Sequence, residues 1–137
     1  MRTIIFSSIL SVLALSACAQ PESSADVAED TLVNVVQSEA ELKRVSKSEF
    51  KAFLAGNENA QLVDVRTPAE YQDGAIDGAL NMDYNKATFE TEINSLDKNA
   101  PVLIYCRSGG RSSKALEVFR ANGFTHVLEL EGGYLNW

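Results

Sequence analysis

Histidine, cysteine and basic residues are scarce in this sequence of 137 residues. One histidine and two cysteines exclude metal sites built from several histidines and a framework of several disulfides. Twelve basic residues stand against 19 acidic ones, and the net charge of −7 argues against binding to nucleic acid or anionic lipid. No apolar run reaches the roughly 20 residues of a membrane-spanning helix. The 45% of apolar residues, over the length of one typical domain, predict one globular core.

The first 18 residues have the pattern of an export signal. Arg2 supplies a positive charge, and a mostly apolar stretch runs from residue 4 to residue 15, as in a secretory signal peptide. The stretch ends in Leu15-Ser16-Ala17-Cys18, which resembles a bacterial lipobox. This resemblance implies that residues 1–17 are removed and that Cys18 carries the lipid. The alternative is an ordinary signal peptide that is cut nearby, with an incidental cysteine.

The lipid would anchor the protein to the cell envelope through its acyl chains. Ala19 follows the lipidated cysteine, and the sorting rule of enteric-type bacteria then favours the outer membrane, with the protein facing the periplasm. Residues 18–40 are polar and acidic and are expected to form a flexible tether to a domain at 41–137. Most cysteines in an oxidising compartment are paired. The one remaining thiol, Cys106, is therefore either a buried small hydrophobe or a functional group.

Strand and helix signals alternate over the rest of the chain. Short runs rich in apolar residues predict five strands, at 42–45, 61–65, 79–82, 102–105 and 127–130. The spacings Ser46–Glu49 and Thr67–Glu70 are those of capping boxes, and further helices are expected over 88–96 and 112–121. The wholly apolar run at 102–105 is typical of a strand buried on both faces. The alternation predicts an α/β domain with a mostly parallel central sheet and helices on both faces.

The run predicted as the most buried strand leads directly into the loop Cys106-Arg107-Ser108-Gly109-Gly110-Arg111. The carboxyl end of a central strand is where α/β sheets place their sites. The two glycines allow the backbone N–H groups to point inward, and the following helix adds positive charge at its N-terminus. With the two arginines, these features favour the thiolate form of Cys106. From the residues alone, the loop is an anion cradle for a sulfur, a phosphate or a carboxylate.

Four segments in this order resemble the single-domain rhodaneses, a family of sulfurtransferases. They are 64–71 (DVRTPAEY), 74–79 (GAIDGA), 105–112 (YCRSGGRS) and 130–134 (LEGGY) with Trp137. The resemblance implies that the Cys106 thiolate takes a sulfane sulfur from a donor such as thiosulfate. It would hold the sulfur as a persulfide and pass it to a thiophilic acceptor.

The same resemblance implies a substrate-binding role for the rest of the loop, Arg107, Ser108, Gly109, Gly110 and Arg111. The substrates would be a small anionic sulfur donor and a thiol or cyanide-like acceptor. It also implies a monomer that uses neither a cofactor nor a metal.

Two features depart from the family pattern. Ala75 and Asp77 stand where the family usually has His and Pro, so a local hydrogen bond and a rigid turn are expected to be missing. Relatives usually continue into a last helix, whereas this sequence stops at Trp137. Either the sequence is a fragment of a longer chain or that helix is missing, and without it the sheet or the site is expected to be partly uncovered.

Three other polar residues invite a catalytic interpretation, and each has a structural alternative that we favour. Asp64 and Arg66 are expected to hold local structure, with Arg66 and Glu70 as an ion pair. His126 is expected to be structural or at the surface. This argues against a papain-like mechanism, which needs a histidine base beside the cysteine.

Two competing functions remain open from the sequence. Phosphatases of the same fold have five residues between Cys and Arg, whereas here Arg111 comes one residue earlier and Ser112 occupies that position. The smaller loop suits a single sulfur atom better than a phosphate. The second alternative is a non-catalytic persulfide carrier or membrane-tethered binding module, which turnover with thiosulfate and cyanide would separate from an enzyme.

Overall fold

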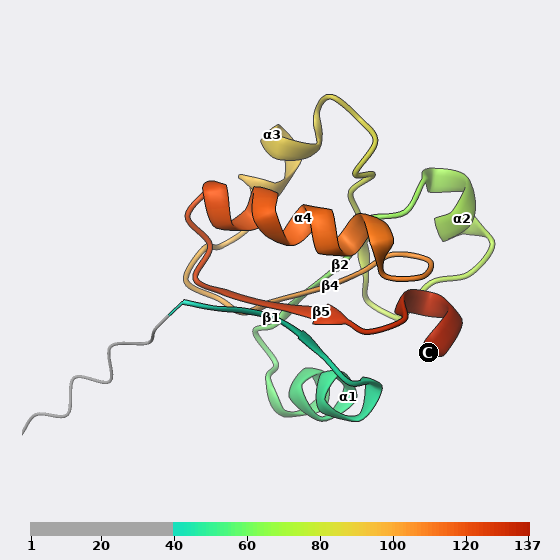
Figure 1. Ribbon diagram of the computed structural model, residues 1–137, viewed down its shortest axis with the longest axis horizontal. Helices are drawn as coiled ribbons and strands as arrows, with labels where there is room; N and C mark the ends of the chain where they lie inside the picture. The colour runs from blue at the N-terminus through green and yellow to red at the C-terminus, as the bar shows by residue number, and fades with distance from the viewer. Residues whose placement is uncertain (1–39) are drawn as a thin grey trace, which may run out of the picture. The chain divides into compact units, whose positions relative to one another are not determined.

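Five parallel strands form one sheet in the order β1-β5-β4-β2-β3 (Figure 1). They are β1 (Glu41–Val45), β2 (Gln61–Asp64), β3 (Leu80–Asn81), β4 (Val102–Tyr105) and β5 (His126–Leu130). The computed structural model describes residues 40–137. The expected signal peptide, the lipidated Cys18 and all but the last residue of the expected tether lie outside the described residues.

Helices cover both faces of the sheet (Figure 1). They are α1 (Lys47–Gly56), α2 (Pro68–Gln72), α3 (Phe89–Ile93), α4 (Gly110–Ala121) and a 3₁₀ turn, η1 (Gly133–Asn136). Helix α1 lies on one face, and α3 and α4 lie on the other. Both capping boxes form as predicted at the starts of α1 and α2. The predicted α/β class with a parallel sheet between helices is confirmed.

Strand β4 is the centre of the core, and all four of its residues are buried. Its side chains alternate between the two faces, as in any strand. Val102 and Ile104 join the cluster under α3 and α4, which includes Phe119. Leu103 and Tyr105 join the cluster on the α1 face. The expectation of a strand buried on both faces is therefore confirmed, and the end of β4 is held from two sides.

Two helices differ in extent from the sequence expectation. Helix α3 ends at Ile93 rather than near residue 96. At its end the Asn94 amide donates to the Glu90 carbonyl at 2.8 Å and the Ser95 hydroxyl donates to the Glu92 carbonyl at 2.7 Å, beside short backbone bonds such as that from the Leu96 N–H to the Ile93 carbonyl at 3.1 Å. Helix α4 begins two residues early, at Gly110, because the chain turns at the preceding glycine.

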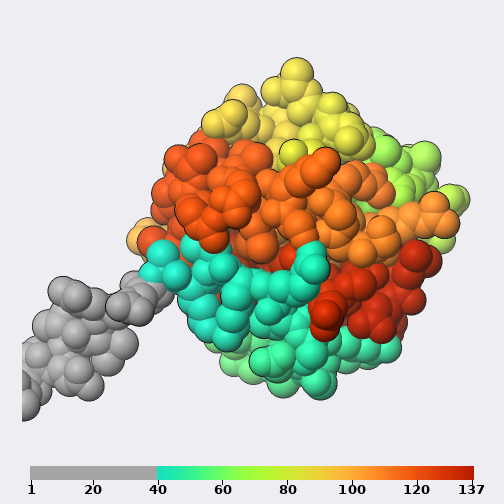
Figure 2. Space-filling view, in the orientation of Figure 1, coloured from blue at the N-terminus to red at the C-terminus, as the bar shows by residue number. Residues whose placement is uncertain are grey.

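Figure 2 shows α4 across the middle of the visible face, between the β1–α1 segment (cyan) and the α3 segment (yellow). None of the helices within 40–137 has the length and apolar character needed to cross a bilayer.

A buried ion pair fixes the end of β2, and it differs from the expected one. The carboxylate of Asp64 accepts from the guanidinium of Arg66 at 2.6 to 3.0 Å. Arg66 also donates to the Gly74 carbonyl at 2.7 Å and lies 4.2 Å from the centre of the Tyr134 ring. The expected pairing of Arg66 with Glu70 was wrong, because Asp64 ends its strand with its side chain already at the guanidinium. The structural role expected for this aspartate and arginine is confirmed.

Contacts from neighbouring side chains hold the segment 74–79, in which a hydrogen bond and a rigid turn were expected to be missing. The Ile76 N–H donates to the Tyr105 hydroxyl at 3.0 Å. The Tyr71 hydroxyl donates to the Ala79 carbonyl at 2.7 Å. With the bond from Arg66 to the carbonyl of Gly74, these contacts anchor both ends and the middle of the turn.

We expect Arg66→Met to lower the free energy of unfolding by about 3 kcal/mol, because it leaves the buried carboxylate of Asp64 without its partner. Urea unfolding followed by circular dichroism measures this change. The control is Arg120→Met, which removes the exposed pair with Glu117 and should leave the midpoint almost unchanged. Equal midpoints for the two variants would contradict a supporting role for the buried pair.

Candidate active site

The sulfur of Cys106 lies at the carboxyl end of β4, inside the turn that leads into α4. The Gly109 N–H donates to Sγ at 3.1 Å, and the Ser112 hydroxyl lies 3.4 Å from Sγ. Gly109 caps the helix with a φ of +96° and has no side chain to accept a bond there. The sulfur therefore takes the place that a capping oxygen usually fills, where it meets the positive end of the helix.

The surroundings of the thiol favour its ionised form. Cys106 is only 1% exposed, and this burial raises the pKa of its thiol. Hydrogen bonds from the hydroxyl and N–H of Ser112 and from the N–H groups of Ser108 and Gly109 outweigh the burial and place the pKa below its ordinary value. Since the thiolate is the nucleophilic form of cysteine, this arrangement prepares the sulfur for attack.

The C-terminal segment supports the loop through hydrogen bonds to the loop carbonyls. The N–H groups of Tyr134 and Leu135 donate to the carbonyls of Cys106 and Arg107 at 2.7 and 3.0 Å. Gly133 permits this approach, because a Cβ on it would lie 2.4 Å from the Cys106 carbonyl oxygen, and its φ is +60°. Gly133 of the LEGGY segment therefore allows the C-terminal backbone to pack against the loop.

Arg111 was expected to supply positive charge to the sulfur anion and its substrate. Its guanidinium is instead bound to a carboxylate. Its two terminal nitrogens each donate to Glu70 at 2.7 Å. Glu70 also accepts from the N–H and hydroxyl of Thr67. The guanidinium of Arg111 holds the pKa of Glu70 at about 2. Arg111 thus joins the start of α4 to the start of α2, and its charge is largely balanced.

The remaining loop residues take different places. Arg107 is exposed and lines a surface hollow beside the loop. The other residues of this hollow are Arg66, Glu70, Asp73, Tyr134 and Leu135. Ser108 is exposed and contributes its N–H to the sulfur. Gly110 is the first residue of α4. The structure thus brings the N–H groups of Ser108 and Gly109 to the sulfur, whereas the side chain of Arg107 is at the surface and that of Arg111 is bound to Glu70.

The sequence analysis missed a buried carboxylate beside this site. Glu129 in β5 is 1% exposed, and it accepts from Ser112 Oγ at 2.7 Å and from Arg44 Nε at 2.8 Å. Its only signal in the sequence is one charged residue within the run at 127–130. A charged side chain in a buried strand is rare unless it is paired.

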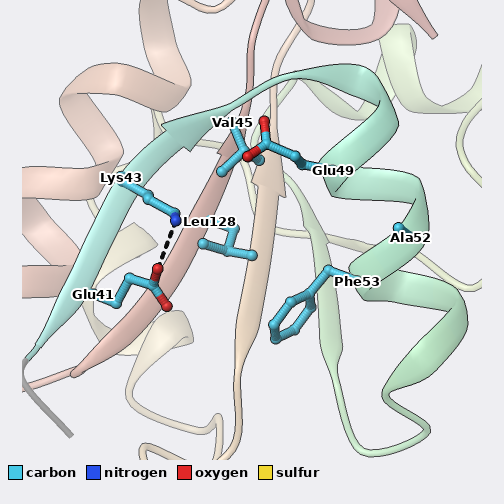
Figure 3. A pocket seen from close by; sticks show the side chains of 7 residues that line it. All are labelled: Glu41, Lys43, Val45, Glu49, Ala52, Phe53 and Leu128. Carbon is cyan, nitrogen blue, oxygen red and sulfur yellow. Dashed lines mark ion pairs between the residues drawn. The ribbon is translucent and has the colours of Figure 1, made fainter.

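A second hollow lies between β1 and α1, and none of its lining residues belongs to the Cys106 loop (Figure 3). Figure 3 shows Phe53 and Leu128 along it and the Glu41–Lys43 ion pair of 2.6 Å at its rim. His126 lies close by, with its Nε2 3.2 Å from Glu41 and its ring 5.1 Å from that of Phe53.

His126 begins β5, which runs parallel to β4. Because Cys106 follows the end of β4, His126 lies at the opposite end of the strands from it. The expectation that His126 is not a base for the cysteine is confirmed.

Comparison with known proteins places this architecture in one family. Residues 46–137 match the rhodanese-like domain. The chain is 36% identical over 106 residues to a sulfurtransferase of Allochromatium vinosum, covering 77% of this chain and 89% of that protein. It is 35% identical over 99 residues to the thiosulfate sulfurtransferase GlpE of Pseudomonas entomophila, covering 72% and 86%.

A crystal structure of a rhodanese-like domain protein from Staphylococcus aureus superimposes with a TM-score of 0.62 at 35% identity, over 69% of this chain and 90% of that one. The chain therefore belongs to the rhodanese-like domain family. Relatives named as sulfurtransferases support a rhodanese-type sulfurtransferase at the level of the family.

We expect Ser112→Ala to raise the pKa of the Cys106 thiol, because the thiolate loses its hydroxyl donor. The rate of alkylation by iodoacetamide as a function of pH measures the change, in a Cys18→Ser background that leaves one thiol. Ser95→Ala, at the end of α3, is the control and should give the wild-type curve. A Ser112→Ala curve that coincides with the control would show that the hydroxyl does not support the thiolate.

Proposed function

We propose that this protein moves a sulfane sulfur from a donor such as thiosulfate to a thiophilic acceptor through a persulfide on Cys106. The observation that carries the proposal is the Cys106 sulfur at the end of β4, held by backbone N–H groups at the start of α4 with its pKa lowered. The two relatives named as sulfurtransferase and thiosulfate sulfurtransferase support the same chemistry.

The reaction has two displacements at sulfur. The Cys106 thiolate attacks the sulfane sulfur of thiosulfate, a new S–S bond forms, and sulfite leaves with the electron pair of the old bond. The persulfide keeps the negative charge on its outer sulfur. A thiolate or cyanide then attacks that outer sulfur, and the Cys106 thiolate leaves. The N–H groups of the loop can stabilise the negative charge in both steps.

Two features of the loop favour a sulfur substrate over a phosphate ester. Only four residues separate Cys106 from Arg111, and the guanidinium of Arg111 is bound by Glu70. A phosphate would need a wider ring and charges that face its oxygens. In this proposal Arg107, the exposed cation beside the loop, attracts the anionic donor, and the protein works as a monomer.

The proposal also places the protein in the cell envelope. Lipid on Cys18 would hold it at the outer membrane, facing the periplasm, with residues 18–40 as the tether. The sequence pattern at residues 1–19 supports this part of the proposal.

Cys106→Ser should abolish sulfur transfer and leave the fold intact, because a hydroxyl of similar size is a poor nucleophile toward sulfur. The intact mass after exposure to thiosulfate should increase by one sulfur atom in the wild type and stay unchanged in the variant. Turnover with thiosulfate and cyanide separates an enzyme from a persulfide carrier, which would load but not turn over. Hydrolysis of aryl phosphates by the wild type that is lost in Cys106→Ser would contradict the sulfurtransferase.

Cys18→Ser should move the protein from the membrane to the soluble fraction or leave a larger precursor, because it removes the site of lipid attachment. Detergent phase partition and the mass of the processed chain measure the outcome in an exporting bacterial host. A Cys18→Ser protein of mature size that still partitions with membranes would contradict the lipid anchor.

A further inference from the structure

Glu129 is a buried carboxylate that the reaction proposed above does not use. It lies in β5 and is 1% exposed. Its oxygens accept from Arg44 at 2.8 and 3.2 Å and from Ser112 at 2.7 Å. Burying a charge lowers stability unless its hydrogen bonds are well made. A carboxylate at this position, one side chain away from the reactive sulfur, therefore needs a reason.

Ser112 connects the carboxylate to the sulfur. Its oxygen lies 2.7 Å from Glu129 Oε1 and 3.4 Å from Cys106 Sγ. A serine hydroxyl has one proton to donate, so the two acceptors compete for it. A bond donated to Glu129 is a bond withheld from the thiolate. Ser113 also lies 3.2 Å from the carboxylate, but its hydroxyl makes no hydrogen bond with the sulfur.

The other charges around the sulfur offset the charge of Glu129 only in part. Arg44, from β1, pairs with the carboxylate and also donates to the Gly109 carbonyl at 3.4 Å, but its side chain is 47% exposed, so solvent screens part of its charge. Arg111, from α4, is bound to Glu70. Among the residues that the structure describes here, Glu129 is the fully buried negative charge next to the cradle of Cys106. It therefore disfavours negative charge on Sγ.

We propose that Glu129, acting through Ser112, is a positioning residue that shifts Cys106 toward its sulfur-loaded form. This inference rests on the proposed sulfur transfer. In the free thiolate the negative charge lies on Sγ, whereas in the persulfide it lies on the outer sulfur, one S–S bond of about 2 Å further along. Coulomb repulsion falls with distance. Loading therefore moves the charge away from Glu129 and relieves the repulsion.

The atoms and charges in the loading step explain why Glu129 would alter the equilibrium constant of persulfide formation. The bond from Sγ to the sulfane sulfur forms, the bond from that sulfur to the sulfonyl group breaks, and sulfite leaves with the electron pair. The total charge is equal on both sides, and no proton is consumed. Only the position of the charge on the protein changes, so a nearby fixed charge alters the equilibrium constant.

The test uses the full chain with Cys18→Ser, equilibrated without oxygen in mixtures of thiosulfate and sulfite, with the loaded fraction read from the intact mass. Glu129→Gln keeps the shape and the acceptor oxygen but removes the charge. It should need a thiosulfate-to-sulfite ratio about three to ten times higher for half loading. Its thiol pKa, measured by alkylation, should fall by about half a unit to one unit. Glu117→Gln, an exposed residue of α4, is the control and should match the wild type.

A double-mutant cycle tests the route through Ser112. In a Ser112→Ala background the effect of Glu129→Gln should become smaller, because the competition for the hydroxyl proton is gone and only the Coulomb repulsion is left. Glu129→Asp, which withdraws the carboxylate from Ser112, should shift the equilibrium in the direction of Glu129→Gln by a smaller factor. It also keeps the test available if Glu129→Gln does not fold.

Equal half-loading ratios and equal thiol pKa values in Glu129→Gln and the wild type would overturn the inference. An undiminished effect in the Ser112→Ala background would overturn the route through the serine. A wild-type protein that takes up no sulfur would instead contradict the sulfurtransferase proposal. The comparison of thiol pKa values would then still decide whether Glu129 acts on Cys106.

Discussion

The turn of the backbone around the Cys106 sulfur is the constraint on which the other parts of the site depend. It requires a left-handed residue at Gly109, which the lack of a side chain allows. It brings N–H groups to Sγ in place of a capping side chain. The loop from Cys106 to Gly109 lies outside the helices and strands. Its shape therefore has to be maintained by the elements around it.

Three parts of the chain maintain the shape of the loop. Strand β4 fixes the start of the loop because it is buried on both faces. The backbone of η1 binds the loop carbonyls, which Gly133 makes sterically feasible. The pair of Arg111 with Glu70 joins the start of α4 to α2. The same capping box that starts α2 orients Glu70 for this pair, so a local signal also serves a contact 41 residues away.

The site combines hydrogen-bond donors that contact the sulfur with a carboxylate, Glu129, that is one side chain away from it. The N–H groups and the Ser112 hydroxyl stabilise a thiolate despite its burial. Glu129 opposes negative charge at the same atom and competes for the same hydroxyl. Such an arrangement suits a sulfur that must both attack a donor and leave from a persulfide. A thiolate that is stabilised too strongly would be a weaker nucleophile.

Local signals were enough to predict much of this fold. Capping boxes depend on contacts three residues apart, and β4 was recognisable because a strand buried on both faces is apolar throughout. The position of Cys106 at the end of that strand followed directly. The pairings of charged residues did not, as the expected partner of Arg66 shows. Glu70 meets Arg111, and Glu129 meets Arg44 and Ser112, only because the chain folds back to bring them together. The sequence by itself determined the elements and the reactive cysteine, since these depend on neighbours along the chain. The tertiary structure alone decided which charges surround the sulfur, because β5 comes to lie between β1 and β4.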